Sequence, residues 1–157
     1  MYFDMPSLTD LKRVYLDVCA LCRPFDDQSI VRIRLETIAV ELILDRVRRK
    51  EIELIVSPAH AVEIDATADL EERNQLVSLL EQFGTRPKFD LLAARKRADD
   101  LLGRGLGVAD AAHLAFAEQA QADFVTVDDR LIKRFKRIRP VIWCGTPPAY
   151  SEKESLR

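Results

Sequence analysis

Residues 107–135 have the sequence GVADAAHLAFAEQAQADFVTVDDRLIKRF, and three different patterns follow one another within it. Residues 108–122 are rich in alanine and other strong helix formers, which predicts a helix. Residues 123–129, DFVTVDD, contain an apolar and β-branched run at 124–127 and end with two acids, which predicts a strand with an acidic carboxyl end. Residues 130–138 combine basic and apolar side chains at helical spacing, which predicts a short amphipathic helix. The order helix, strand, helix indicates an α/β protein.

The same alternation of strands and helices continues on both sides of this stretch. Residues 13–18 predict a first strand, with Val14 and Leu16 on one face and Tyr15 on the other. Further strands are expected over 52–56 and 141–143, and further helices over 29–50, from Ser57-Pro58 onward, over 69–83 and over 91–102. Such an alternation predicts a three-layer α/β/α fold around a central parallel sheet.

The length and composition of the chain favour a single globular domain. The chain has 157 residues, enough for one domain with its own core, which we expect over residues 1–146. Residues 147–157 are polar and are expected to form a frayed tail. Hydrophobic residues make up 48% and charged residues 32%, which excludes a disordered chain. Because no apolar run reaches the roughly 18 residues of a membrane span, and the first residues lack a secretory signal, we expect a cytoplasmic location without membrane contact.

Acidic side chains occur where the predicted strands end and the next helices begin. Asp17 ends the first strand, Glu63 lies on the helix after the second, Asp110 opens the helix after GLG, and Asp128 ends the FVTV strand. In an open parallel sheet these positions share one edge, where ligands bind. Clustered carboxylates repel one another unless a cation lies between them, and Mg²⁺ or Mn²⁺ prefers such oxygen ligands. The sequence therefore predicts a divalent-metal site that could hydrolyse a phosphodiester.

Each acid taken alone has a simpler interpretation. Asp and Glu are common at helix starts, where they cap the helix or interact with its dipole. Asp128, followed by Asp129 and Arg130, has the sequence expected of a cap for the basic helix. The metal-site hypothesis therefore depends on all of the acids converging on one place. In the absence of metal, their mutual repulsion is expected to raise carboxylate pKa values.

Four segments carry a resemblance to a known family. They are VYLDVCALCRPFDD (14–27), VSPAHAVEI (56–64), the stretch 107–135 already described, and IRPVIW (138–143). The resemblance covers residues 13 to 143, and its most specific part is DAAHLAFA followed by a strand ending in T-x-D. With these segments the chain resembles the PIN-domain ribonucleases, the fold of the VapC-type toxins of bacterial toxin–antitoxin pairs.

The resemblance implies a PIN-like fold, an activity and a role for each acid. Asp17, Glu63, Asp110 and Asp128 match the family acids that hold one or two Mg²⁺ or Mn²⁺ ions and activate water for RNA cleavage. Thr126 matches the threonine of T-x-D, whose hydroxyl is expected to support the site. The implied partners are RNA and a cognate antitoxin protein. The implied products carry 5′-phosphate and 3′-hydroxyl ends.

Basic side chains near the predicted site are candidates for binding the RNA backbone. The net charge is −2, so nucleic-acid binding must come from a local patch. Lys133 and Arg134 lie in the basic helix beside Asp128 and are predicted to contact phosphates. Arg23 follows the first strand and is a third candidate, although it could equally pair with Asp26 or Asp27. A solvated helix face is the alternative explanation for the basic run.

The histidines and cysteines are given structural interpretations. His113 follows Asp110 by three residues, and His60 precedes Glu63 by three, so either could serve a metal or a proton transfer. We favour packed or capping histidines. Cysteines 19 and 22 form a C-x-x-C motif, but a zinc site would need ligands that the sequence does not supply, and buried thiols are favoured over redox or zinc roles.

Two alternative functions are compatible with the sequence, and one oligomeric state is expected. A haloacid-dehalogenase-like phosphatase also has an Asp after its first strand, but it needs a second Asp two residues later, where this chain has Cys19. A catalytically silent PIN-fold binding module is the other alternative. A homodimer is expected, because the helices over 29–50 and 69–83 carry more apolar surface than one small core needs.

Overall fold

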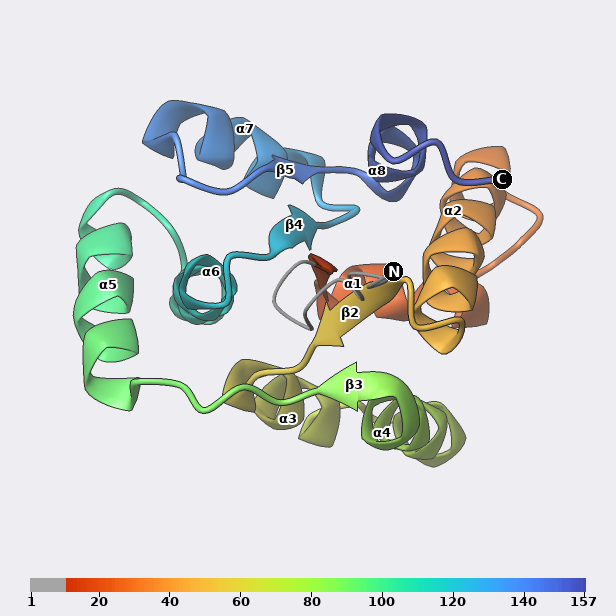
Figure 1. The fold of residues 1–157 in the computed structure, drawn as a ribbon, viewed down its shortest axis with the longest axis horizontal. Coiled ribbons are helices and arrows are strands. Elements are labelled where there is room, and N and C mark those ends of the chain that lie inside the picture. The colour runs from red at the N-terminus through yellow and green to blue at the C-terminus, as the bar shows by residue number, and fades with distance from the viewer. Residues whose placement is uncertain (1–10) are drawn as a thin grey trace, which may run out of the picture.

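Residues 11–157 are described by a computed structural model; the residues before them, where the secretory signal was sought, lie outside this range. Its centre is a five-stranded sheet in the order β3-β2-β1-β4-β5, with every neighbouring pair parallel (Figure 1). The strands are β1 (Lys12–Leu16), β2 (Ile52–Ile55), β3 (Gly84–Thr85), β4 (Asp123–Val125) and β5 (Cys144–Gly145). The predicted parallel α/β sheet is therefore confirmed.

Helices connect the strands and cover both faces of the sheet. They are α1 (Val18–Leu21), the 3₁₀ turn η2 (Arg23–Phe25), α2 (Val31–Arg48), α3 (Pro58–Asp65), α4 (Leu70–Phe83), α5 (Leu91–Gly103), α6 (Val108–Gln119), α7 (Asp129–Ile138) and α8 (Pro147–Lys153). Figure 1 shows α2 and α8 on one side of the sheet and α5 and α6 on the other. None of the helices within residues 11–157 has the length and apolar character needed to cross a bilayer.

The two faces of β1 lead into two separate parts of the hydrophobic core. Val14 and Leu16 pack with residues of α2, α4 and α8, whereas Tyr15 packs with α5, α6 and α7. All three side chains are fully buried. The alternation predicted for this strand is thus observed, and the central strand is apolar on both faces because helices cover both.

The pairing of β1 with β4 determines which residues meet at the carboxyl edge of the sheet. Leu16 is the register partner of Val125. The next residues along the two parallel strands, Asp17 and Thr126, therefore lie beside each other, and the Asp17 amide donates to the Val125 carbonyl at 2.9 Å. This edge is where ligands bind in open parallel sheets.

Three segments differ from the sequence-based expectation. Gly84 was expected only to end a helix, but with Thr85 it forms β3 beside β2. The last strand is Cys144–Gly145 rather than 141–143, although the Trp143 carbonyl still accepts from the Phe124 amide at 2.8 Å. Residues 147–153 form α8 instead of a frayed tail, because Tyr150 is fully buried against the α2 side of the core.

Gly84 lies at a close contact and should not tolerate a side chain. A Cβ at this position would lie 2.4 Å from both the Leu80 carbonyl oxygen and Val56 Cγ2. We expect Gly84→Ala to lower the free energy of unfolding by about 1–3 kcal/mol in urea, because the backbone must shift. Gly103→Ala is the control, since no heavy atom lies within 4 Å of its added Cβ. Equal stability of the two variants would contradict this packing.

Candidate functional site

A hollow of about 500 Å³ lies at the carboxyl edge of the sheet. Its lining contains all four predicted acids, Asp17, Glu63, Asp110 and Asp128. They come from the end of β1, from α3, from the first turn of α6 and from the position just before α7. A hollow of similar size, about 530 Å³, lies between α3 and α4 and is lined largely by apolar side chains, without any of these acids.

Asp17 is buried and held by three donors. Its Oδ1 accepts from the Val18 amide at 2.8 Å, which makes it the N-cap of α1, and its Oδ2 accepts from Thr126 Oγ1 at 3.0 Å and from Cys19 Sγ at 3.3 Å. Burial raises the pKa of Asp17 and the charge of Glu63 adds to this, whereas His113 and the hydrogen bonds from Cys19 and Thr126 oppose it. The carboxylate is therefore well oriented but poorly compensated.

Thr126 connects Asp17 with Asp128. Its hydroxyl donates to Asp17 and accepts from the Asp128 backbone amide at 3.1 Å. Asp128 itself is the N-cap of α7, since its Oδ1 accepts from the amides of Arg130 and Leu131 at 3.0 and 3.2 Å. The simple capping interpretation thus holds for both aspartates. Both also line the hollow, because a helix begins where each strand ends.

Asp110 and Glu63 have opposite electrostatic environments. Asp110 is half-buried, and its pKa is raised by burial and then by the charges of Asp17 and Asp128. The pKa of Glu63 is lowered by His113, whose Nε2 lies 3.6 Å from Glu63 Oε2. Repulsion among carboxylates is the condition in which a bound divalent cation is most stabilising.

The two histidines are buried side by side near these acids. His60 Nε2 donates to the Leu16 carbonyl at 2.8 Å, and its Nδ1 accepts from the Ser57 amide at 3.1 Å. Burial lowers the pKa of His60 to about 4, so it is neutral and packed, as expected. His113 differs: together with Asp17 and Glu63 it offers ligand atoms that all lie within 4.8 Å of one another. The only sequence signal for this was its spacing from Asp110.

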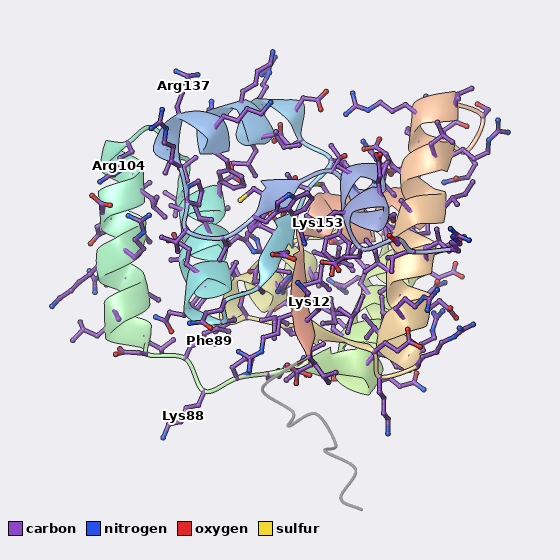
Figure 2. All side chains as sticks on the ribbon, turned by 45° about the horizontal axis from the view of Figure 1, so that its top comes forward. Lys12, Lys88, Phe89, Arg104, Arg137 and Lys153 are labelled. Atoms are coloured by element: carbon purple, nitrogen blue, oxygen red, sulfur yellow. The ribbon has the colours of Figure 1, made fainter. Side chains whose placement is uncertain are left out.

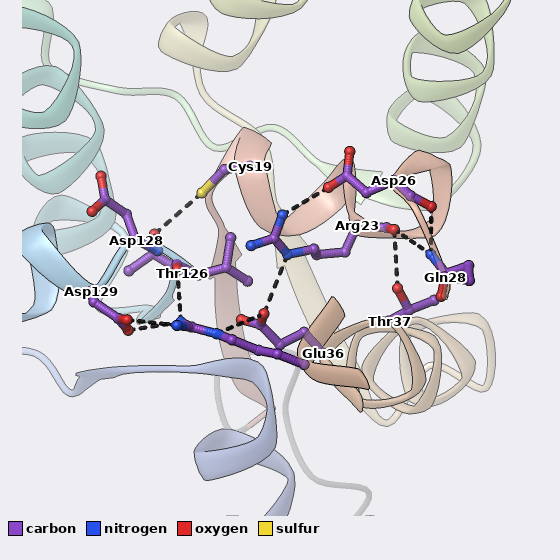
Figure 3. A network of polar contacts seen from close by, with 11 residues as sticks. Cys19, Arg23, Asp26, Gln28, Glu36, Thr37, Thr126, Asp128 and Asp129 are labelled. Carbon is purple, nitrogen blue, oxygen red and sulfur yellow. Dashed lines mark hydrogen bonds and ion pairs between the residues drawn. The ribbon is translucent and has the colours of Figure 1, made fainter. Parts of the chain in front are cut away.

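Arg23 lines the hollow but is held by two carboxylates (Figure 3). Its Nη1 donates to Asp26 at 2.8 Å, and its Nε lies 3.4 Å from Glu36 of α2, a contact that the sequence did not indicate. Glu36 is in turn 3.2 Å from Arg32, which pairs with Asp129 at the start of α7. This chain of ion pairs connects α2 with both flanks of the site.

Lys133 and Arg134 are exposed on α7, five and six residues after Asp128. Neither forms an ion pair with any residue in the described part of the chain. Figure 2 shows Arg137 of the same helix projecting away from the protein. The basic side of α7 is thus solvated and free to bind an anion.

Each of the three cysteines is half-buried rather than fully buried. Cys19, Cys22 and Cys144 are all free thiols. Burial, as the largest cause, raises the pKa of each to about 12. Reactive cysteines have lowered pKa values, so these agree with the expected structural role.

Comparison with known proteins identifies the fold. No family model and no curated protein sequence matches the chain. Several solved structures are similar to this chain, including the following two. FitAcB from Neisseria gonorrhoeae has a TM-score of 0.52 and 16% identity, covering 85% of this chain and 97% of its own. FitAB bound to an IR36 DNA fragment has a TM-score of 0.51 and 14% identity, covering 85% and 94%. The predicted three-layer α/β/α PIN-like fold is thereby confirmed.

Proposed function

We propose that the protein is a divalent-metal-dependent endoribonuclease of the PIN type. The observation that carries this proposal is the convergence of Asp17, Glu63, Asp110 and Asp128, from four separate elements, on one hollow. The raised pKa values of Asp17 and Asp110 support it, because burial and the neighbouring acidic charges outweigh the opposing effect of His113 at both carboxyl groups. Structural ion pairs would have the opposite effect on these groups.

The residues present fit Mg²⁺ or Mn²⁺, which take carboxylate oxygens and water as ligands. Asp17, Glu63, Asp110 and Asp128 would hold the cation, and Asp128 is the exposed member of this set. When bound, such a cation supplies activation of water and neutralisation of phosphate charge. Thr126 keeps Asp17 in position through its hydroxyl.

Substrate binding is assigned to the exposed basic side of α7. Lys133 and Arg134 would bind phosphates next to the acidic hollow, where the backbone charge of RNA needs neutralising. Arg23 is also predicted to contact phosphate, and to do so it must exchange its contacts with Asp26 or Glu36 for the substrate. We therefore expect Arg23 to contact a phosphate only after RNA has bound to the protein.

We further propose that the protein is the toxin of a toxin–antitoxin pair and forms a homodimer. The toxin assignment rests on the resemblance of its motifs to VapC-type toxins and on the fold shared with FitAcB and FitAB. The dimer is supported by an exposed apolar stripe at the start of α2, formed by Ile30, Val31, Leu35 and Ile38. The cytoplasmic location stays a prediction.

The test of nuclease activity is metal-dependent cleavage of single-stranded RNA. Protein stripped with EDTA should not cleave, and addition of Mn²⁺ or Mg²⁺ should restore cleavage to products with 5′-phosphate and 3′-hydroxyl ends. Cleavage that persists in EDTA would contradict the proposal. Metal binding without cleavage would favour the silent binding module. Phosphatase activity would instead need an acid two residues after Asp17, where Cys19 lies.

A further inference from the structure

His113 has one ring nitrogen that is bonded and one that is not. Its side chain is 1% exposed, and Nδ1 is hydrogen-bonded to the Tyr15 hydroxyl. Nε2 has no hydrogen-bond partner among residues 11–157. Buried polar atoms without a partner are rare in folded proteins, so each calls for an explanation. The orphan nitrogen is on the side of the ring that faces Glu63 Oε2, at 3.6 Å.

The position of Nε2 matches that of a metal ligand. Asp17, Glu63 and His113 each offer one atom, and these atoms lie within 4.8 Å of one another. Ligands at about 2.1 Å from one cation can be at most about 4.2 Å apart. Only small rotations of the side chains would bring the three atoms into the coordination sphere of a single ion.

We propose that His113 is a nitrogen ligand, through Nε2, of the cation held by Asp17 and Glu63. The centre would then be a mixed nitrogen and oxygen site rather than an all-carboxylate one. Imidazole ligands favour first-row transition ions over Mg²⁺. The inference deepens the proposed function by assigning the resident ion as a transition ion such as Mn²⁺.

Tyr15 provides the support that a ligating histidine requires. Metal-bound histidines usually donate their other ring N–H to a fixed acceptor, which orients the ring. Here Nδ1 can donate to Tyr15 Oη, and Tyr15 can donate to Ser57 Oγ, which lies 2.7 Å away. Tyr15 is therefore a positioning residue. When Nδ1 of His113 donates its hydrogen to the Tyr15 hydroxyl, the lone pair of Nε2 is available to the cation.

The decisive experiment uses the unmodified chain, because it contains only two histidines. Mn²⁺ bound to the protein is studied by pulsed EPR, with ¹⁴N histidine and then with ¹⁵N-labelled histidine. The expected result is a directly coordinated nitrogen whose signal changes from ¹⁴N to ¹⁵N with the label. Both nitrogens of His60 are bonded to the backbone, so the signal belongs to His113.

A variant separates ligation from support of the fold. His113→Gln should abolish the histidine signal and weaken Mn²⁺ binding at least tenfold while changing Mg²⁺ binding less than twofold. Bound Mn²⁺ without a histidine signal in the unmodified chain would overturn the inference and leave the nuclease proposal intact. A histidine signal in a protein that does not cleave RNA would uphold the inference and overturn the nuclease. Absence of divalent-ion binding would overturn both.

Discussion

Replacing Asp17 and Asp110 together by asparagine is expected to reduce RNA cleavage by about a thousandfold or more. Both carboxylates line the acidic hollow, and burial is the main cause that raises the pKa of both. Charge stabilisation by a metal centre contributes several kcal/mol to a transition state, and about 1.4 kcal/mol corresponds to a tenfold change in rate. Initial rates on single-stranded RNA with saturating Mn²⁺ measure the effect. Asp99→Asn on the exposed side of α5 is the matched control.

The same double variant should be more stable than the parent protein when metal is absent. Both aspartates have pKa values above the ordinary 3.8, so the folded state binds more protons than the unfolded state just above that pH. Stability of the metal-free protein therefore falls as the pH rises from 3.8 through the raised pKa values. The double variant should lose this dependence, and Mn²⁺ should no longer raise its Tm. Retained cleavage would contradict a catalytic role for these acids, and a less stable variant would contradict the cost of keeping them charged in the metal-free protein.

Tyr150→Ala is expected to lower the free energy of unfolding by about 3–5 kcal/mol, as large-to-small changes of buried aromatic residues do. The Tyr150 ring is fully buried, with its centroid 5.8 Å from that of Trp143, and it belongs to the core shared with α2. Lys153 Nζ lies 5.4 Å from the same ring, so the substitution also removes a cation–π contact. Urea unfolding of the full chain measures the change.

Tyr150→Phe is the control for this experiment. The Tyr150 hydroxyl is buried without a hydrogen-bond partner in the part of the chain that the structure describes. Removing it should therefore leave stability unchanged or slightly increased, because no bond is lost and a buried polar group is removed. If Tyr150→Ala were as stable as Tyr150→Phe, residues 147–157 would be the frayed tail that their polar composition predicts.

Much of the architecture follows from local patterns in the sequence. The alternation of Val14, Tyr15 and Leu16 assigns the first strand and its two faces, because side chains alternate along any strand. Helical periodicity likewise places α2, α4 and α5 within a few residues of their observed ends. The positions of Asp17 and Asp128 at strand ends were sufficient to predict their meeting, since all parallel strands of one sheet end at the same edge.

Other features depend on contacts between distant residues, which local patterns do not contain. The strand β3 has only two residues, and its extended conformation depends on backbone pairing with the edge strand β2. Helix α8 is ordered because Tyr150 packs into the hydrophobic core together with residues of α2 and the strands. Arg23 pairs with Glu36, and His113 turns its free nitrogen toward Glu63, only after α2, α3 and α6 have packed. The sequence alone determined which residue types border the carboxyl edge of the sheet. The tertiary structure decided which side-chain atoms of these residues remain available to a ligand, because the other polar atoms are buried or already hydrogen-bonded to neighbouring residues.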